Sequence, residues 1–183
     1  VRLFVEEGAR VVIADMQRER GERLAAELGD AARFVQVEVR QEDQVKGAID
    51  TATNDWGRRD CIFTNGGFGG VLGPIEDIPV EAFDMSFDVL VKGVFLGMKH
   101  AIPVMRKEGA GSIINTGSIA AITAGRGPMV YAACKAAVVH LSKVTAMSVA
   151  DDSIRVNAIC PGSIYFEGGV WDEAKKNNPE LYA

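Results

Sequence analysis

The sequence predicts an α/β fold in which helices cover both faces of a parallel β-sheet. Short apolar runs recur along the chain, and each is followed by a longer segment with apolar residues at helical spacing. The short runs are continuous rather than alternating, which is typical of strands that are buried on both faces. Strands that alternate with helices form βαβ units with right-handed crossovers, so we expect a doubly wound, Rossmann-like sheet.

The elements follow one another in a regular order. The chain opens in the last turns of a helix that ends at Gly8, and a buried strand follows over residues 11–14. Helices are predicted over 17–28, 42–56, within 81–106 and over 130–149, and further strands over 34–37, 61–64, 112–115 and 155–159. Because no linker-like stretch interrupts this order, we expect residues 1–183 to form one domain.

Composition excludes several classes of function. The net charge of −5 and the pI near 5.1 argue against nucleic acid or an anionic membrane as a partner. The apolar runs are shorter than the roughly 20 residues of a membrane-spanning helix. Three unpaired cysteines and two histidines favour free thiols and no metal site. These features predict a cytoplasmic protein that acts on small molecules.

Candidate ligand-binding residues stand where the predicted strands end. The carboxyl ends of parallel strands meet at one edge of the sheet, which is where such folds bind ligands. Five residues stand at or just beyond these ends and are expected to converge there: Asp15, Glu38, Asn65, Ser118 and Pro161.

Asp15 suggests which cofactor that edge binds. A carboxylate at the end of this strand can accept hydrogen bonds from an adenosine ribose, and it repels the additional phosphate of NADP, so Asp15 favours NAD. The alternative is a solvated turn aspartate or a helix cap. Asn65, Gly66 and Gly67 supply flexible backbone near which a ligand can lie, or form an ordinary glycine turn.

Tyr131 and Lys135 are candidates for acid–base chemistry. Their i, i+4 spacing puts both side chains on one face of a helix. A nearby ammonium stabilises a phenolate by about 4 kcal/mol at 4 Å and an effective dielectric constant of 20, before desolvation opposes it. Such a pair also occurs by chance in many helices. Ser118 stands thirteen residues before Tyr131 and can hold a substrate oxygen beside the phenol, unless it only caps a turn.

These motifs together closely resemble those of the short-chain dehydrogenase/reductase family. The resemblance rests on Ser118, on residues 131–135 (Tyr-Ala-Ala-Cys-Lys) and on residues 154–162 (Ile-Arg-Val-Asn-Ala-Ile-Cys-Pro-Gly). Residues 8–15 match the second-strand region of the family, and residues 65–67 look like a variant of its Asn-Asn-Ala-Gly loop. The likeness covers essentially the whole chain, and the ordered spacings make it specific.

The resemblance implies an NAD-dependent enzyme that transfers hydride between nicotinamide and a secondary alcohol or ketone. Tyr131 would be the acid/base, Lys135 would bind the nicotinamide ribose and stabilise the phenolate, and Ser118 would orient the substrate oxygen. The family also implies a homotetramer or homodimer packed through helices 81–106 and 130–149. Further cofactor contacts would come from Asp15 (ribose), Glu38 and Val39 (adenine), Asn65 and Gly66 (backbone), and Pro161, Gly162 and Ile164 (nicotinamide pocket).

The chain departs from the family pattern in several places. The family opens with a strand and a glycine-rich turn that cradles the pyrophosphate, whereas this sequence starts in the helix that follows, so we expect it to be part of a longer polypeptide. Leu90 stands where the family has an asparagine that relays protons to the lysine. Glu38 replaces an aspartate, and Tyr165 replaces a threonine that meets the cofactor amide. Residues 166–171 either begin a mobile substrate lid or form an ordinary surface loop.

Two rival functions follow from these departures and from Ser118. A serine hydrolase needs a base beside its nucleophile, but residues 116–120 do not form the G-x-S-x-G elbow of that class. An NAD-binding sensor or scaffold of the same fold is the stronger alternative, because Leu90 and the absent glycine turn are compatible with lost activity. His100 and Cys134 are expected to serve packing or an interface rather than catalysis.

Overall fold

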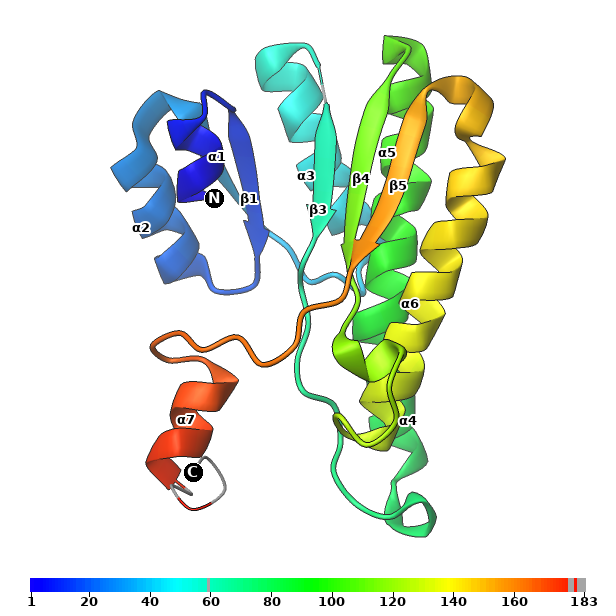
Figure 1. Cartoon of the computed structure of the whole chain (residues 1–183). Helices are drawn as coiled ribbons and strands as arrows, with labels where there is room; N and C mark the ends of the chain where they lie inside the picture. The colour runs from blue at the N-terminus through cyan, green and yellow to red at the C-terminus, as the bar shows by residue number, and fades with distance from the viewer. Residues whose placement is uncertain (59, 178–179, 181–183) are drawn as a thin grey trace.

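The computed structural model describes residues 1–58, 60–177 and 180 and confirms the predicted α/β fold. All its strands run parallel and form two sheets. Strands β1 (Val11–Asp15) and β2 (Ala32–Gln36) pair in one sheet, and the other has the order β3 (Cys61–Thr64), β4 (Gly111–Thr116), β5 (Ile154–Ile159). β1 and β3 stand next to each other without pairing, so the doubly wound sheet is divided at this point (Figure 1).

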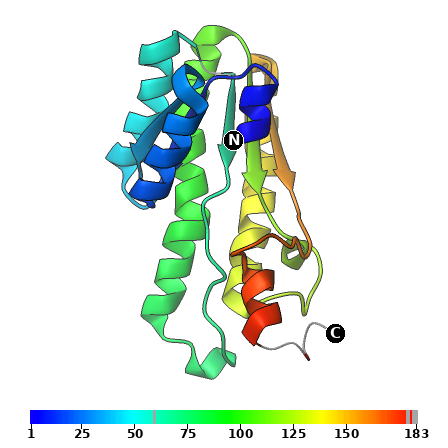
Figure 2. The same ribbon diagram turned by 90° about the vertical axis from the view of Figure 1, so that its left-hand side faces the viewer.

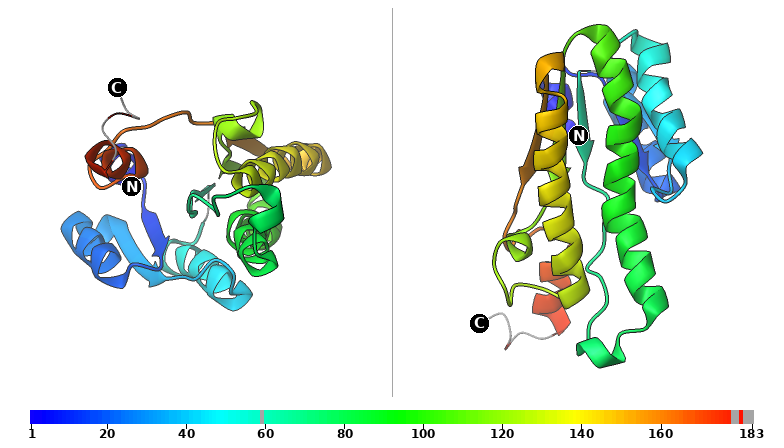
Figure 3. Two further views of the ribbon diagram at one scale, coloured as in Figure 1. Left: turned by 90° about the horizontal axis from the view of Figure 1, so that it is seen from below. Right: turned by 90° about the vertical axis from the view of Figure 1, so that its right-hand side faces the viewer.

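The helices are distributed over both sides of the strands. α3 (Glu42–Trp56), α5 (Gly93–Glu108) and α6 (Met129–Ser148) lie together on one face, and α1 (Arg2–Glu6) and α7 (Val170–Asn177) lie on the other side (Figures 2 and 3). α2 (Arg18–Leu28) packs against β1 and β2, and α4 (Val80–Phe87) packs against α6. Single 3-10 turns occupy Gly29–Ala31, Ile75–Asp77, Ile119–Ala121 and Ala150–Asp152. None of the helices in the described ranges is long and apolar enough to cross a membrane.

The core lies between the three-stranded sheet and the helices on its covered face. Ala101, Met105, Ile113 and Val138 are fully buried there. The fit is tight because a Cβ atom at Gly111 would stand only 2.6 Å from Met105 Cγ. The last turn of α5 is thereby packed closely against the start of β4. This contact fixes how far β4 extends along the helix axis and hence where the carboxyl end of β4 lies.

The predicted long helix within residues 81–106 is interrupted. α4 is followed by a π-helical turn over Asp88–Lys92 before α5 begins at Gly93. The widened turn buries Leu90 against Val130 and Cys134 of α6. Gly93 admits the side chain of Val39, since a Cβ atom here would lie 3.0 Å from Val39 Cβ. The spacing of apolar residues in the sequence does not predict a π-helical turn, in which one additional residue is inserted into the helix. Such turns often occur at functional sites.

The other predicted boundaries differ by only a few residues. β2 begins at Ala32 and ends at Gln36 rather than covering residues 34–37, although the Val37 N–H still donates to the Asp15 carbonyl at 3.0 Å. α6 begins and ends one residue earlier than predicted. Residues 166–171 form a turn that leads into α7.

Candidate active site

The loops that carry the predicted site residues all lie at one end of the molecule. The strands of both sheets point the same way, so their carboxyl ends open toward the lower side of Figure 1. The N-terminal end of α6 is at this same end (Figure 1). The structure brings the loops after β3 and β4 to Tyr131, and main-chain hydrogen bonds join the loop after β5 to the turn that follows β4.

Tyr131 and Lys135 are neighbours on the face of α6 that is turned toward the sheet. The Lys135 Nζ atom lies 5.6 Å from the centroid of the Tyr131 ring and donates a hydrogen bond to the Thr116 carbonyl at 2.7 Å. Lys135 is buried, and this desolvation lowers the pKa of its ammonium below the ordinary value.

Ser118 is buried beside the same helix. Its hydroxyl caps the turn Ile119–Ala121 by accepting the Ala120 N–H at 3.1 Å, so the capping role considered above is present. The hydroxyl proton remains able to point to a ligand. The turn reaches Tyr131 through Gly127, where a Cβ atom would lie 3.6 Å from Ala120 Cβ and 3.4 Å from Tyr131 Cδ1.

Thr116 connects two of the predicted residues and was not itself predicted. Its hydroxyl donates to Asn65 Oδ1 at 3.0 Å, and its carbonyl accepts the Lys135 ammonium. It therefore fixes the loop after β3 relative to α6. The signal in the sequence was its place as the last residue of β4, directly before Gly117 and Ser118.

A buried polar network supports this end of β4. Asn115 is fully buried; its Oδ1 accepts the Thr64 hydroxyl at 2.7 Å, and its Nδ2 donates to Ser142 Oγ at 2.9 Å. Ser142 in turn donates to the Val138 carbonyl at 2.7 Å. β3, β4 and α6 are thus joined through one amide. Single polar residues within apolar runs were the only sign of this network in the sequence.

The glycine-containing loop after β3 approaches Tyr131 closely. Gly70 has a φ of 77°, and a Cβ atom here would lie 3.0 Å from Tyr131 Cβ. Gly66 borders Val39, with 3.5 Å between a Cβ atom at Gly66 and Val39 Cγ1. The flexible backbone expected of residues 65–67 therefore runs between the end of β2 and α6. Glycine is needed at position 70, where both the conformation and the space exclude a side chain.

Asp15, Glu38 and Val39 lie at the ends of β1 and β2, separate from Tyr131. A hollow of about 330 Å³ opens here, lined by Met16, Gln36, Glu38 and Gln44. Asp15 is exposed beside it, and its Oδ1 accepts the Gln17 N–H at 2.8 Å, as in an Asx turn; the N-cap of α2 is Gln17 and not Asp15. A polar hollow with an exposed carboxylate at its border fits the ribose and base of an adenosine.

Glu38 is less available than the sequence suggested. Its carboxylate accepts the Arg40 guanidinium at 3.0 Å, and this pairing holds the pKa of Glu38 below its ordinary value. Its N–H donates to Gln44 Oε1 at 2.8 Å. Arg40 also contacts Met85 of α4, and its Nε is buried without a partner among the described residues. Arg40 thus positions Glu38, a role that the sequence did not reveal.

The predicted nicotinamide-pocket residues follow β5. The Pro161 carbonyl accepts the Ile119 N–H at 2.9 Å, and the Ile159 carbonyl accepts the Gly117 N–H at 2.7 Å. The segment after β5 therefore lies directly beside the Ser118 turn. Gly162 has open space where a side chain would be, and Ile164 is exposed.

Beyond Ile164 the chain folds onto α7 through Asp172. This buried carboxylate accepts the Tyr165 hydroxyl at 2.8 Å, the Gly168 N–H at 2.9 Å and the Lys176 ammonium at 2.6 Å. Together these donors lower the pKa of Asp172 to about 2. Residues 165–176 are therefore tied together as a unit, and the hydroxyl of Tyr165 is used inside it. The sequence analysis did not identify Asp172.

The environment of Leu90 is apolar. Leu90 is 1% exposed and packs with Val130, Cys134 and Phe87. A Cβ atom at Gly67 would lie 3.0 Å from Leu90 Cδ2, so this side chain also reaches the loop after β3. Cys134 is fully buried and burial raises the pKa of its thiol to about 11, which agrees with a packing role.

We expect Leu90→Asn to raise turnover severalfold if proton exchange between Lys135 and solvent limits the rate. An amide in this position can hold a water molecule, which leucine cannot do. The measurement is kcat at saturating substrate, with its solvent deuterium isotope effect. Leu90→Met, which keeps the position apolar, serves as the control and should leave both quantities unchanged. An unchanged kcat in Leu90→Asn, with the fold intact, would show that this exchange is not limiting.

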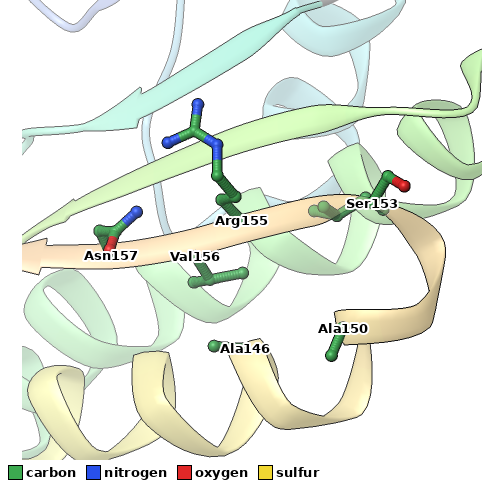
Figure 4. A pocket seen from close by; sticks show the side chains of 7 residues that line it. Ala146, Ala150, Ser153, Arg155, Val156 and Asn157 are labelled. Atoms are coloured by element: carbon green, nitrogen blue, oxygen red, sulfur yellow. The ribbon is translucent and has the colours of Figure 1, made fainter.

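Two other features lie outside this end of the molecule. The Nε2–H of His100 donates a hydrogen bond to the Glu42 carboxylate at 2.9 Å and thereby joins α5 to α3. A shallow groove of about 630 Å³ runs between β5 and the C-terminal part of α6, lined by Ala146, Ala150 and residues 153–157 (Figure 4). It contains none of the predicted site residues. Within residues 1–58, 60–177 and 180, no group of three His, Cys, Asp or Glu side chains is placed to hold a metal ion.

Comparisons with known proteins agree with this geometry. A family model described as enoyl-(acyl carrier protein) reductase matches residues 1–178. The chain is 40% identical over 167 residues to (+)-borneol dehydrogenase 2 of Salvia officinalis, covering 90% of this chain and 59% of that protein. It is also 40% identical over 164 residues to 3-alpha-(or 20-beta)-hydroxysteroid dehydrogenase of Mycobacterium tuberculosis, covering 90% of this chain and 63% of that protein. It thus spans about 60% of the length of these curated relatives.

Solved structures show the same fold. The 3-ketoacyl-(acyl-carrier-protein) reductase of Brucella melitensis, complexed with NADH, has a TM-score of 0.81 and 34% identity, covering 87% of this chain and 67% of that one. ElxO with NADP bound has a TM-score of 0.88 and 26% identity, covering 98% of this chain and 72% of that one. Both of these structures contain a nicotinamide cofactor, NADH in the first and NADP in the second.

Proposed function

This chain belongs to the short-chain dehydrogenase/reductase family, and on that premise we propose that it transfers hydride between a nicotinamide cofactor and a secondary alcohol or ketone. The observation that carries the proposal is the placement of the Lys135 ammonium 5.6 Å from the ring of Tyr131, at the end of the sheet where the loops after β3, β4 and β5 meet. The dehydrogenases and reductases among its relatives support the same reaction class.

In this proposal the chain's own residues position the substrate and move its proton. The Ser118 hydroxyl donates to the substrate oxygen. In alcohol oxidation the Tyr131 phenolate accepts the hydroxyl proton, and in ketone reduction the phenol returns it to the same oxygen. Lys135 keeps its charge beside the ring and is held in place by the Thr116 carbonyl. The bound cofactor supplies or accepts the hydride.

We propose NAD rather than NADP, because Asp15 stands beside the hollow at the ends of β1 and β2. Asp15 would bind the adenosine ribose, and Glu38 and Val39 the adenine. The remaining contacts would come from Asn65, Gly66, Pro161, Gly162 and Ile164, with Tyr131 and Lys135 at the nicotinamide ribose.

Asp15→Ser is expected to raise the affinity for NADPH relative to NADH by about tenfold, because it removes a negative charge next to the additional phosphate. Fluorescence titration of both reduced cofactors gives the two Kd values and hence their ratio. Asp30→Ser, in the turn before β2, is the control and should leave the ratio as in the parent chain. A ratio that is equally unchanged in Asp15→Ser would contradict this assignment of Asp15.

The reaction itself is tested by NAD reduction at 340 nm with a panel of secondary alcohols. Turnover that depends on Tyr131 supports the enzyme. The alternative, an NAD-binding sensor or scaffold, is favoured by the apolar burial of Leu90. NAD binding without turnover across the panel would support that alternative. A serine hydrolase is not supported, because His100 pairs with Glu42 and not with Ser118.

We further propose a cytoplasmic homotetramer or homodimer. The helices that would pack between subunits, α5 and α6, expose the large apolar side chains of Phe95, Val144 and Met147. Burying such side chains against a second copy is favourable. Light scattering of the purified protein measures the assembly.

A further inference from the structure

Large apolar side chains are exposed on the loops after β3, β4 and β5. Their exposed fractions range from 41% for Phe68 to 82% for Leu72. Scattered exposed apolar residues are ordinary, but a group drawn from separate segments around one position marks a binding surface. The members are Phe68, Leu72 and Ile75 after β3, Ile122 after β4, and Ile164 and Phe166 after β5.

The contacts between the three loops place this group at the candidate active site. Val71, next to Leu72, packs against the cluster that contains Tyr131. Ile122 directly follows the turn that Ser118 caps, and its N–H donates to the Ile119 carbonyl at 3.1 Å. The Ile119 N–H donates to the Pro161 carbonyl, which joins the third loop to the same turn. Leu72 therefore lies next to the cluster that contains Tyr131, and Ile122 lies next to the turn that Ser118 caps.

The loops are also almost free of charge. Charged residues make up 25% of the whole chain, yet residues 65–74, 117–128 and 160–166 contain a single charged side chain, Arg126, and the two charged residues that follow Ile75, Glu76 and Asp77, are acidic. The next charged residue after the third loop is acidic, Glu167. A substrate that carries a carboxylate or phosphate, or that is delivered on an acidic carrier protein, needs complementary positive charge at the entrance. These loops offer one arginine.

We propose that the substrate is a free, uncharged and lipophilic secondary alcohol or ketone whose apolar body lies against these loops. This proposal rests on the proposed hydride transfer. Only the carbinol or carbonyl group meets polar atoms, at Ser118 and Tyr131, and the rest of the molecule replaces water on apolar side chains.

The test compares substrates of different polarity. Probes are decahydro-2-naphthol, an uncharged bicyclic alcohol; 2-propanol; 3-hydroxybutyrate; and a 3-hydroxybutyryl thioester on acyl carrier protein. We expect kcat/KM for decahydro-2-naphthol to exceed that of each of the others at least tenfold. Ile122→Lys should then lower this value at least fivefold, through KM, without changing the Kd for NADH. A preference for hydroxybutyrate or for the carrier thioester would overturn the proposal.

A matched variant separates a local effect from a general one. Leu3→Lys introduces the same charge at a similarly exposed apolar position, on α1, and should leave all four kcat/KM values unchanged. If no probe is turned over, the proposed reaction fails, and the substrate class is then decided by saturation-transfer NMR of decahydro-2-naphthol. Binding that weakens in Ile122→Lys and not in Leu3→Lys supports the apolar site, whereas absence of binding overturns it.

Discussion

Replacing Tyr131 by phenylalanine is expected to lower kcat by about 10²- to 10⁴-fold, the usual contribution of a positioned acid–base group. The contacts of Tyr131 with Gly70 are made by its Cβ and main-chain atoms and those with Gly127 by its ring carbons, and phenylalanine retains all of these atoms. The substitution therefore removes only the group that would exchange the proton. Because cofactor contacts elsewhere are unchanged, the Kd for NADH should remain within about threefold of the parent value.

Tyr165→Phe provides the comparison, because it removes a hydroxyl that already has a structural partner in Asp172. It should loosen the unit formed by residues 165–176 and change KM more than kcat. The assay is NADH formation at 340 nm, with circular dichroism to verify folding. Retention of most of the activity in Tyr131→Phe would exclude Tyr131 as the acid/base and would favour the sensor.

Asn115→Ala is expected to reduce the free energy of unfolding by about 2–4 kcal/mol. The substitution leaves the buried Thr64 hydroxyl without its acceptor and removes the donor to Ser142. It also leaves a small cavity where the amide was fully enclosed. The carboxyl ends of β3 and β4 lose their common anchor, so cofactor affinity should fall together with stability.

Asn157→Ala is the matched control, since the same change is made at an exposed position in the neighbouring strand β5. It should alter stability by no more than about 0.5 kcal/mol. Urea denaturation followed by fluorescence measures both variants, and equal m-values are required for the comparison. Similar losses in the two variants would show that the buried network contributes nothing specific.

The sequence predicted the parts of this structure that depend on local pattern. Continuous apolar runs located the strands, because a strand covered on both faces has no polar side. The i, i+4 spacing of Tyr131 and Lys135 placed the pair on one helix face, and the strand ends located Asp15, Asn65 and Pro161 at one edge. These are properties that a few neighbouring residues determine by themselves.

Features that depend on contacts between distant segments were not predicted. The π-helical turn at Asp88–Lys92 allows Val39 to pack on Gly93, and Val39 is far away in the sequence. Asn115 resembles any polar residue at the end of a strand until Thr64 and Ser142 are placed beside it. From the sequence, Asp172 is expected on the solvent-exposed face of an amphipathic helix. It is buried only because the preceding segment folds back and places Tyr165 and Gly168 against its carboxylate.

Thr116 holds its two partners in different ways, and this affects how the site tolerates mutation. Lys135 is bound by the main-chain carbonyl of residue 116, which every amino acid provides. Asn65 is bound by the side chain, which only a hydroxyl residue of similar size replaces. Substitutions at 116 therefore vary the attachment of the glycine loop while the lysine keeps its anchor. The hydrogen bond between Lys135 and residue 116 does not depend on the side chain at this position, whereas the attachment of the loop after β3 does.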